Sequence, residues 1–276
     1  MTDQTIRFKD CGIYYLVYEN PTKETIVMLH PYASSGLLFD SQIMALKRDF
    51  QLVLIDMPGH GKSGVSRNVT FRDMPEIIRL VLQEIEVESA HFIGVSEGSV
   101  VAQGFAQVFP KQLKSLTSIS AYSIFHESDK AIRGELRLTS IKHFFLRWFS
   151  FKRYKKFYIL QSALSNQGME KFGKTMKGFK RRSHKAKKGL NRFSKMGRQT
   201  SFYPTYVVCG EHDLEVIKDA SMQHGQKVPM ATIEGYPNTK QIVFLDNPRL
   251  FNDHLITFLK NVNRIEADYA RRSKSR

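Results

Sequence analysis

Six short apolar runs restrict the fold of this chain more than any other feature. Most are rich in β-branched residues, and they read TIVMLH (25–30), FQLVLIDMPG (50–59), HFIGVS (91–96), LKSLTSIS (113–120), TYVVCGEHD (205–213) and MATIEGY (230–236). Between them, residues 71–87, 98–109 and 247–262 place apolar side chains at the three- and four-residue spacing of amphipathic helices. Buried strands that alternate with such helices predict an α/β fold, with a mostly parallel central sheet and helices on both faces. The segment 5–20 is expected to form a hairpin that adds antiparallel strands at one edge.

The composition is that of a globular chain without a metal or cofactor signature. Its 276 residues are 42% hydrophobic, enough for one large domain with an inserted subdomain. The two cysteines, Cys11 and Cys209, lie far apart in sequence, and no Gly-x-Gly-x-x-Gly motif follows a strand, so we expect no metal and no cofactor. Neither a signal-peptide pattern nor a run of about 18 apolar residues is present, which predicts a cytoplasmic protein.

The positive charge of the chain is concentrated in one segment. The net charge is +16, yet residues 130–200 hold 21 of the 42 lysines and arginines and only two acidic residues. The same region shows no strand alternation, and it contains the run HFFLRWF (143–149), whose apolar side chains we expect to form its core. We therefore predict a basic helical cap at residues 123–201, inserted into a core domain formed by residues 1–122 and 202–276.

Three motifs lie at the ends of predicted strands. GVSEG (94–98) has the form Gly-x-Ser-x-Gly, in which a serine on a tight strand-to-helix turn projects from the carboxyl edge of a sheet. LHPYASSG (29–36) and DMPGHGKSG (56–64) follow two other strands. In this order and spacing the motifs resemble the α/β-hydrolase fold family, of the type with an inserted cap. The resemblance covers nearly the whole chain outside the cap.

The resemblance implies a serine nucleophile and most of its supporting groups. Ser96 takes the nucleophile position, and the backbone N–H groups of Tyr32 and Glu97 would stabilise the oxyanion that forms when its hydroxyl attacks a carbonyl. Asp213, just past the seventh strand, matches the triad acid that orients an imidazole. The Glu97 carboxylate is unfavourable beside an oxyanion unless a cation, such as one from the cap, pairs with it or the side chain faces away.

The histidine of the triad is missing from the segment in which the family carries it. The family's histidine follows the last strand, shortly before an Asn-Pro step, but here residues 233–248 read IEGYPNTKQIVFLDNP. Counting forward from the strand indicates Asn238, and counting back from Pro248 indicates Gln241. Neither amide accepts a proton near neutral pH, so the triad is predicted to be incomplete, a loss that lowers turnover by about 10⁶-fold. His224 and His254 could reach Ser96 only by an unusual chain path, His126 and His143 belong to the cap or its edge, and the resemblance implies no catalytic role for His30 and His60.

Two hypotheses follow for the function. The first is a serine hydrolase of the carboxylesterase or thioesterase type, which acts on a carboxylic ester or thioester through Ser96 despite its incomplete triad. The alternative is a catalytically inactive or weak homologue that binds an anionic ligand, an acidic protein or a membrane surface through its basic cap.

The residue composition of the cap also ranks the classes of partner that we expect. Its cations attract anions and its aromatic residues offer apolar surface, which favours an acyl group on an acidic carrier protein or on coenzyme A. An anionic membrane surface comes next, because KRYKKFYIL (152–160) mixes cations and aromatics as interfacial segments do. Nucleic acid is the least favoured partner, since no recognised binding motif frames the cations.

Overall fold

The computed structural model describes residues 1–124, 144–190, 193 and 203–274, with the backbone alone from residue 266 onward. Residues 125–143, 191–192 and 194–202, of which all but residue 202 belong to the predicted cap, lie outside the described residues.

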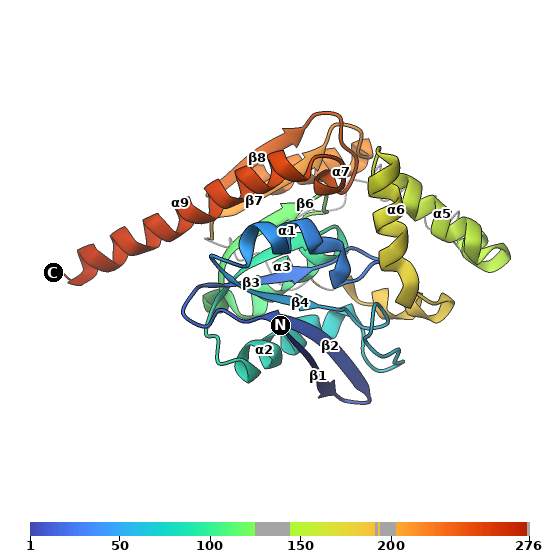
Figure 1. Ribbon diagram of the computed structural model, residues 1–276, viewed down its shortest axis with the longest axis horizontal. Coiled ribbons are helices and arrows are strands. Elements are labelled where there is room, and N and C mark those ends of the chain that lie inside the picture. The colour runs from blue at the N-terminus through green and yellow to red at the C-terminus, as the bar shows by residue number, and fades with distance from the viewer. Residues whose placement is uncertain (125–143, 191–192, 194–202, 275–276) are drawn as a thin grey trace.

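Within the described residues, eight strands form one sheet in the order β1-β2-β4-β3-β5-β6-β7-β8 (Figure 1). The neighbours β1–β2 and β2–β4 are antiparallel and all the others are parallel. This arrangement confirms the predicted mostly parallel sheet and places the hairpin at one edge. The strands are β1 (Thr2–Phe8), β2 (Cys11–Tyr18), β3 (Thr25–Leu29), β4 (Gln51–Ile55), β5 (Ala90–Val95), β6 (Leu113–Ile119), β7 (Thr205–Gly210) and β8 (Ala231–Tyr236).

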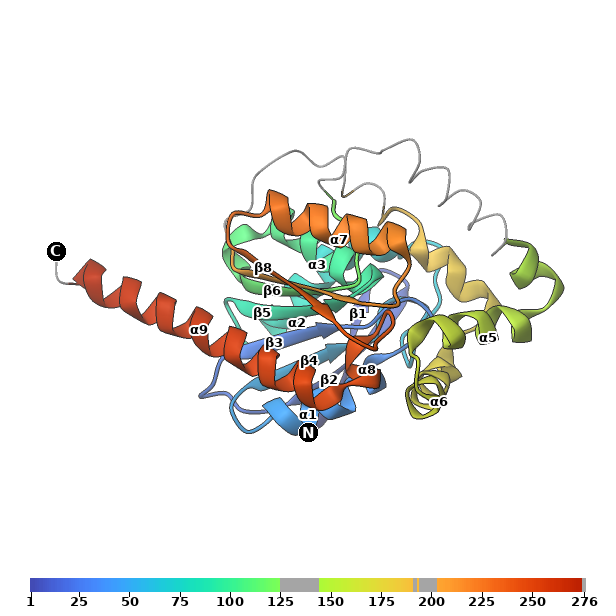
Figure 2. The ribbon, with the colours of Figure 1, turned by 90° about the horizontal axis from the view of Figure 1, so that it is seen from above.

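Helices cover both faces of the sheet, as the sequence predicts. Figure 2 shows α1 and α9 on one face and α3 and α7 on the other, and α2 packs against α3. The helices are α1 (Asp40–Leu46), α2 (Met74–Glu84), α3 (Glu97–Val108), α5 (Phe151–Ser162), α6 (Asn166–Thr175), α7 (Glu215–Lys227), α8 (Val243–Asp246) and α9 (Pro248–Lys274). The backbone of residues 144–149 is also helical.

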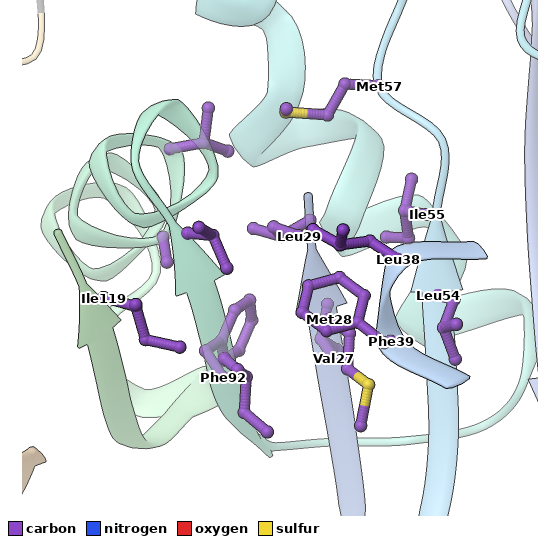
Figure 3. Close-up of a cluster of buried hydrophobic side chains, with 14 of the residues drawn as sticks. Val27, Met28, Leu29, Leu38, Phe39, Leu54, Ile55, Met57, Phe92 and Ile119 are labelled. Carbon is purple, nitrogen blue, oxygen red and sulfur yellow. The ribbon is translucent and has the colours of Figure 1, made fainter. Parts of the chain in front are cut away.

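The core lies on both sides of the central strands. Every residue of β3, β4 and β5 is buried, because parallel strands that are covered by helices on two faces need side chains suited to burial throughout. Figure 3 shows Val27 and Leu29 of β3 near Leu54 of β4 and Phe92 of β5 in this core. Helix α9 closes one face with buried side chains at three- and four-residue spacing, Phe251, Leu255, Leu259 and Val262.

Residues 120–204, between β6 and β7, are called the insertion below. Its helices α5 and α6 lie at the end of the molecule opposite the C-terminal end of α9 (Figures 1 and 2). The insertion meets the body closely at Gly178, where a Cβ atom would lie 2.1 Å from the carbonyl oxygen of Gly61. The described part of the insertion is helical, while the division into core domain and cap stays a prediction.

Within the described residues, none of the helices combines the length and the apolar character needed to span a bilayer.

The contact between α3 and β3 should depend on the absence of a side chain at Gly98. A Cβ atom there would lie 2.2 Å from the carbonyl oxygen of Leu29, which is backbone and cannot move aside cheaply. We expect Gly98→Ala to lower the free energy of unfolding in urea by about 2 kcal/mol or more. Gly235→Ala is the control, because a Cβ atom there meets nothing within 4 Å, and equal losses in the two variants would contradict this account.

Candidate active site

Ser96 lies on a strained turn between β5 and α3. Its φ of 51° and ψ of −116° cost a residue other than glycine about 1–3 kcal/mol. The Ser96 N–H donates to the carbonyl of Ile119 on β6 at 2.8 Å. A Cβ atom at Gly94 would lie 2.4 Å from the Cα of Ser99, so the motif glycines let the strand and the helix approach closely. The serine therefore sits at the carboxyl edge of the sheet, as the motif predicts.

The side chain of Glu97 occupies the place expected for an oxyanion. Its Oε2 accepts the Ser96 hydroxyl at 2.9 Å and the Tyr32 backbone N–H at 3.2 Å. The Glu97 backbone N–H, the second predicted oxyanion donor, also stabilises this carboxylate. Glu97 therefore faces the site, and its carboxylate takes the donors that a substrate oxygen would need.

Lys187 of the insertion neutralises Glu97. It ends the 3₁₀ helix η5 (Arg181–Lys187), its ammonium pairs with Glu97 Oε1, and it lies 4.9 Å from the centre of the Tyr32 ring. Burial alone would raise the pKa of Glu97, but the charge and hydrogen bond of Lys187 and the donors around the carboxylate lower this pKa to about 2. Glu97 is therefore ionised at neutral pH.

Aromatic residues of the insertion cover Tyr32 and close the site. The Tyr32 ring packs edge-on against Phe179, with 5.1 Å between ring centres, and the Tyr154 hydroxyl donates to the Tyr32 hydroxyl at 3.3 Å. Burial raises the pKa of Tyr32 well above its ordinary value, so the phenol stays neutral. The consequence for Ser96 is that only 8% of its surface is exposed.

Gln241 is one of the two positions that the sequence suggests for the missing base, and it contacts Ser96. Its Nε2 donates to Ser96 Oγ at 3.4 Å. Asn238, the other position that the sequence suggests, adopts a φ of 54°, and its backbone N–H donates to Glu211 at 2.8 Å. The Ser96 hydroxyl thus lies between an amide that takes up no proton and a carboxylate with a pKa of about 2. Neither group is an effective general base near neutral pH.

In the described part of the chain, no histidine side chain forms a hydrogen bond to Ser96 Oγ in place of the missing base. Among the described residues, the side chains of Glu97 and Gln241 are the hydrogen-bond partners of Ser96 Oγ. His30 is buried and bonded to two backbone groups at 2.7 and 2.9 Å, and burial lowers its pKa to about 4. His126 and His143 lie outside the described residues.

Asp213 follows β7 and is 8% exposed. Its Oδ1 accepts the Leu214 N–H at 2.8 Å, but Oδ2 has no hydrogen-bond partner among the described residues. Burial raises the pKa of Asp213 to about 6, against smaller opposing effects of the Leu214 N–H and of the Ser120 hydroxyl, whose geometry falls short of a hydrogen bond. A triad histidine would donate to such an oxygen.

Two cavities lie near these groups, and Ser96 lines neither. One of about 170 Å³ is lined by Asp213 and Gln241 together with Gln161, His212, Leu214 and Lys240. A larger one of about 480 Å³ lies between strands β2 and β4 and the insertion, with Tyr14, Asp56, Lys62 and Gly178 in its lining. In the part of the chain that the structure describes, no three His, Cys, Asp or Glu side chains gather as a metal site would require.

Comparisons with known proteins place this geometry in a family. Residues 24–248 match the family model of the alpha/beta hydrolase fold. The chain belongs to this family. It is 21% identical over 268 residues to the uncharacterized hydrolase YugF of Bacillus subtilis, a match that covers 90% of this chain and 94% of the relative. It is 24% identical over 219 residues to the pimeloyl-(acyl-carrier protein) methyl ester esterase of Wigglesworthia glossinidia brevipalpis, covering 79% and 75%.

The solved structures show the same fold. A carboxylesterase of Nitrososphaera gargenis is similar with a TM-score of 0.76 and 16% identity, over 95% of this chain and 99% of that one. The protein is therefore an alpha/beta hydrolase with esterase-like homologues.

Lys187 is the site residue that sequence reasoning did not single out. The sequence left open whether a cation of the cap pairs with Glu97 or the carboxylate faces away. Residues 181–189 read RRSHKAKKG and contain five lysines and arginines, so no local signal distinguishes one of them. The distinction comes from η5, which brings Lys187 beside the Tyr32 ring.

Replacing Asp213 by asparagine should stabilise the protein at neutral pH. Because the pKa of this carboxyl is about 6 when folded and ordinarily 3.8, the folded state binds more protons between these values. The free energy of unfolding therefore falls as the pH rises from about 4 to about 6. We expect Asp213→Asn to abolish this pH-dependent fall. Measured by urea denaturation, the free energy of unfolding should rise by about 2–3 kcal/mol at pH 8 and change little at pH 4.

The matched control is Asp219→Asn, which changes an exposed carboxylate on α7. It should shift the free energy of unfolding by less than about 0.5 kcal/mol at both pH values. A gain for Asp213→Asn that does not depend on pH would contradict the assignment of a buried, uncompensated charge.

Proposed function

We propose that the Ser96 site binds a small anionic group, such as a carboxylate, and does not hydrolyse esters by a triad. The observation that carries this proposal is that a carboxylate, that of Glu97, already fills the oxyanion pocket. It is held by the Tyr32 N–H, the Ser96 hydroxyl and the Lys187 ammonium, while Gln241 adds a further N–H donor at Ser96. A site rich in donors and without a base suits an anion better than an ester.

Ester hydrolysis faces two separate obstacles at this site. An amide in the position of the imidazole removes the general base, a loss of about 10⁶-fold in a serine triad. A filled oxyanion pocket removes donors that each lower the barrier by roughly 3 kcal/mol. Because the two defects involve different groups in the same attack, the correction of one leaves the other in place.

A ligand enters the site by displacing the Glu97 side chain. The Lys187 side chain, which is 45% exposed, then pairs with the ligand in place of Glu97. The ligand anion then accepts from Tyr32 and Ser96 in place of Glu97. The tethered carboxylate competes at high effective concentration, so a natural ligand needs contacts beyond its anionic end.

Acetate binding to Glu97→Ala tests this proposal. The substitution removes the internal carboxylate and leaves the donors, so acetate should bind and raise the melting temperature at constant ionic strength with chloride as the reference anion. A dissociation constant of about 10 mM would give about 1.4 kcal/mol of stabilisation at about 100 mM acetate.

The wild type and Glu97→Ala/Lys187→Met are the matched controls. The wild type should respond weakly because Glu97 occupies the donors, and the double variant should respond weakly because the cation is gone. Equal acetate effects in all three proteins, or none in Glu97→Ala, would refute the anion site.

A second candidate is slow hydrolysis of a carboxylic ester or thioester through Ser96. The strained backbone of Ser96 favours it, because such strain is concentrated at functional positions. The similarity to an esterase that acts on an acyl-carrier-protein ester suggests a carrier-linked acyl substrate, for which the basic insertion supplies cations.

A fluorophosphonate probe separates the two candidates. Under the anion-site proposal, the wild type is labelled no faster than Ser96→Ala. Gln241→His/Glu97→Met, which supplies an imidazole beside Asp213 and empties the pocket, should hydrolyse p-nitrophenyl acetate at least about 100-fold faster than the wild type. Rapid labelling of the wild type at Ser96 would establish the hydrolase instead, and a double variant that stays inactive would refute this reading of the base position.

A further inference from the structure

Four large aromatic side chains are exposed together at residues 144–149 of the insertion. Phe144 is 49% exposed, Phe145 52%, Trp148 67% and Phe149 77%. We call these four residues the aromatic tip. The sequence predicts that they form the core of the cap, and the structure contradicts this expectation because their side chains face solvent.

The aromatic tip is one continuous face of a short helix. Phe144 stacks on Trp148 with 6.3 Å between ring centres, and Phe145 stacks on Phe149 with 6.2 Å. Both pairs have the four-residue spacing that places side chains on the same side of a helix. Leu146 packs toward the core and thereby turns the aromatic face outward. A contiguous apolar patch of this kind marks an interaction surface.

Cations line the outer face of the helix that follows. In α5 the side chains of Lys152, Arg153 and Lys156 are exposed, while Tyr154 on the other side is buried against the body. Over residues 144–190 the chain has 14 lysines and arginines and a single acidic residue. Residues 144–149 and α5 follow each other along the chain at the end of the molecule opposite the C-terminal end of α9 (Figures 1 and 2), and the burial of the described residues leaves both the tip aromatics and the α5 cations exposed.

We propose that the aromatic tip and the outer face of α5 dock on an anionic phospholipid bilayer. Exposed tryptophan and phenylalanine beside lysine and arginine is the composition of segments that lie in the membrane interface. The rings enter the boundary between headgroups and acyl chains, and the cations contact lipid phosphates. An acidic protein would satisfy the cations but gives no reason for four adjacent exposed rings. This inference does not rest on the anion site at Ser96 and would stand if that proposal failed.

The chain's single tryptophan makes the proposal directly measurable, because Trp148 lies in the aromatic tip. Vesicles with equal parts of phosphatidylcholine and phosphatidylglycerol should shift its emission to shorter wavelength and protect it from acrylamide. Vesicles of phosphatidylcholine alone should have little effect, and high salt should release the protein. Sedimentation with the vesicles gives the partition coefficient.

Two pairs of variants separate docking from a general effect of charge or hydrophobicity. Lys152→Glu/Arg153→Glu and Phe145→Ser/Phe149→Ser should each lower the partition coefficient at least about 10-fold. The matched controls change exposed residues of the body, as Lys47→Glu/Arg48→Glu for charge and Leu37→Ser/Met44→Ser for apolar surface, and should retain binding. All of these positions are on the surface, so the variants should keep the wild-type melting temperature.

The remaining outcomes overturn the proposal. Equal binding to both kinds of vesicle would remove the requirement for anionic lipid. An equal fall of the partition coefficient in the test and control pairs would show that binding does not depend on the proposed docking face. A tryptophan shift with poly-L-glutamate and none with anionic vesicles would make an acidic polypeptide the partner.

Discussion

The close approach of Gly98 to the carbonyl oxygen of Leu29 positions Ser96, Glu97 and the Tyr32 backbone. It holds the first turn of α3 against the carboxyl end of β3, which forces the bend at Ser96 and brings the Tyr32 backbone beside it. Glu97 is the first residue of α3, so its carboxylate also lies in the positive field at the helix N-terminus. The geometry that an esterase uses to hold a substrate oxygen thus holds a side chain of the protein itself.

The two carboxylates of the site have opposite environments. Glu97 has a cation and several donors, which keep its pKa near 2, whereas burial raises the pKa of Asp213 to about 6 and the charge of Lys218 opposes this rise only in small part. In a serine triad the acid and the base compensate each other's charge. Here the compensation has moved to the oxyanion pocket, and Asp213 keeps the cost of burial without its usual partner. This distribution of charge supports the proposal that the site binds an anion.

The parts of the structure that sequence reasoning predicted are those set by local pattern. Strand runs such as TIVMLH and the Gly-x-Ser-x-Gly turn depend on neighbouring residues, so the sheet and the bend at Ser96 could be foreseen. The absence of a histidine in residues 233–248 was equally readable. The choice between Asn238 and Gln241 was not, because it depends on how the chain turns after β8, where Asn238 adopts a positive φ.

Long-range contacts explain what the sequence left open or misplaced. The direction of the Glu97 side chain depends on Lys187, which is 90 residues away and lies in a run of similar cations. The aromatic tip has the pattern of a core segment, and only the packing of Leu146 determines that its rings face outward.

The ion pair between Lys187 and Glu97 also joins the insertion and the body energetically. The body buries a charge whose compensation comes from the insertion, so it loses part of its own stability whenever the insertion detaches or is cut away. The insertion and the first turn of α3 are therefore coupled in energy through this ion pair.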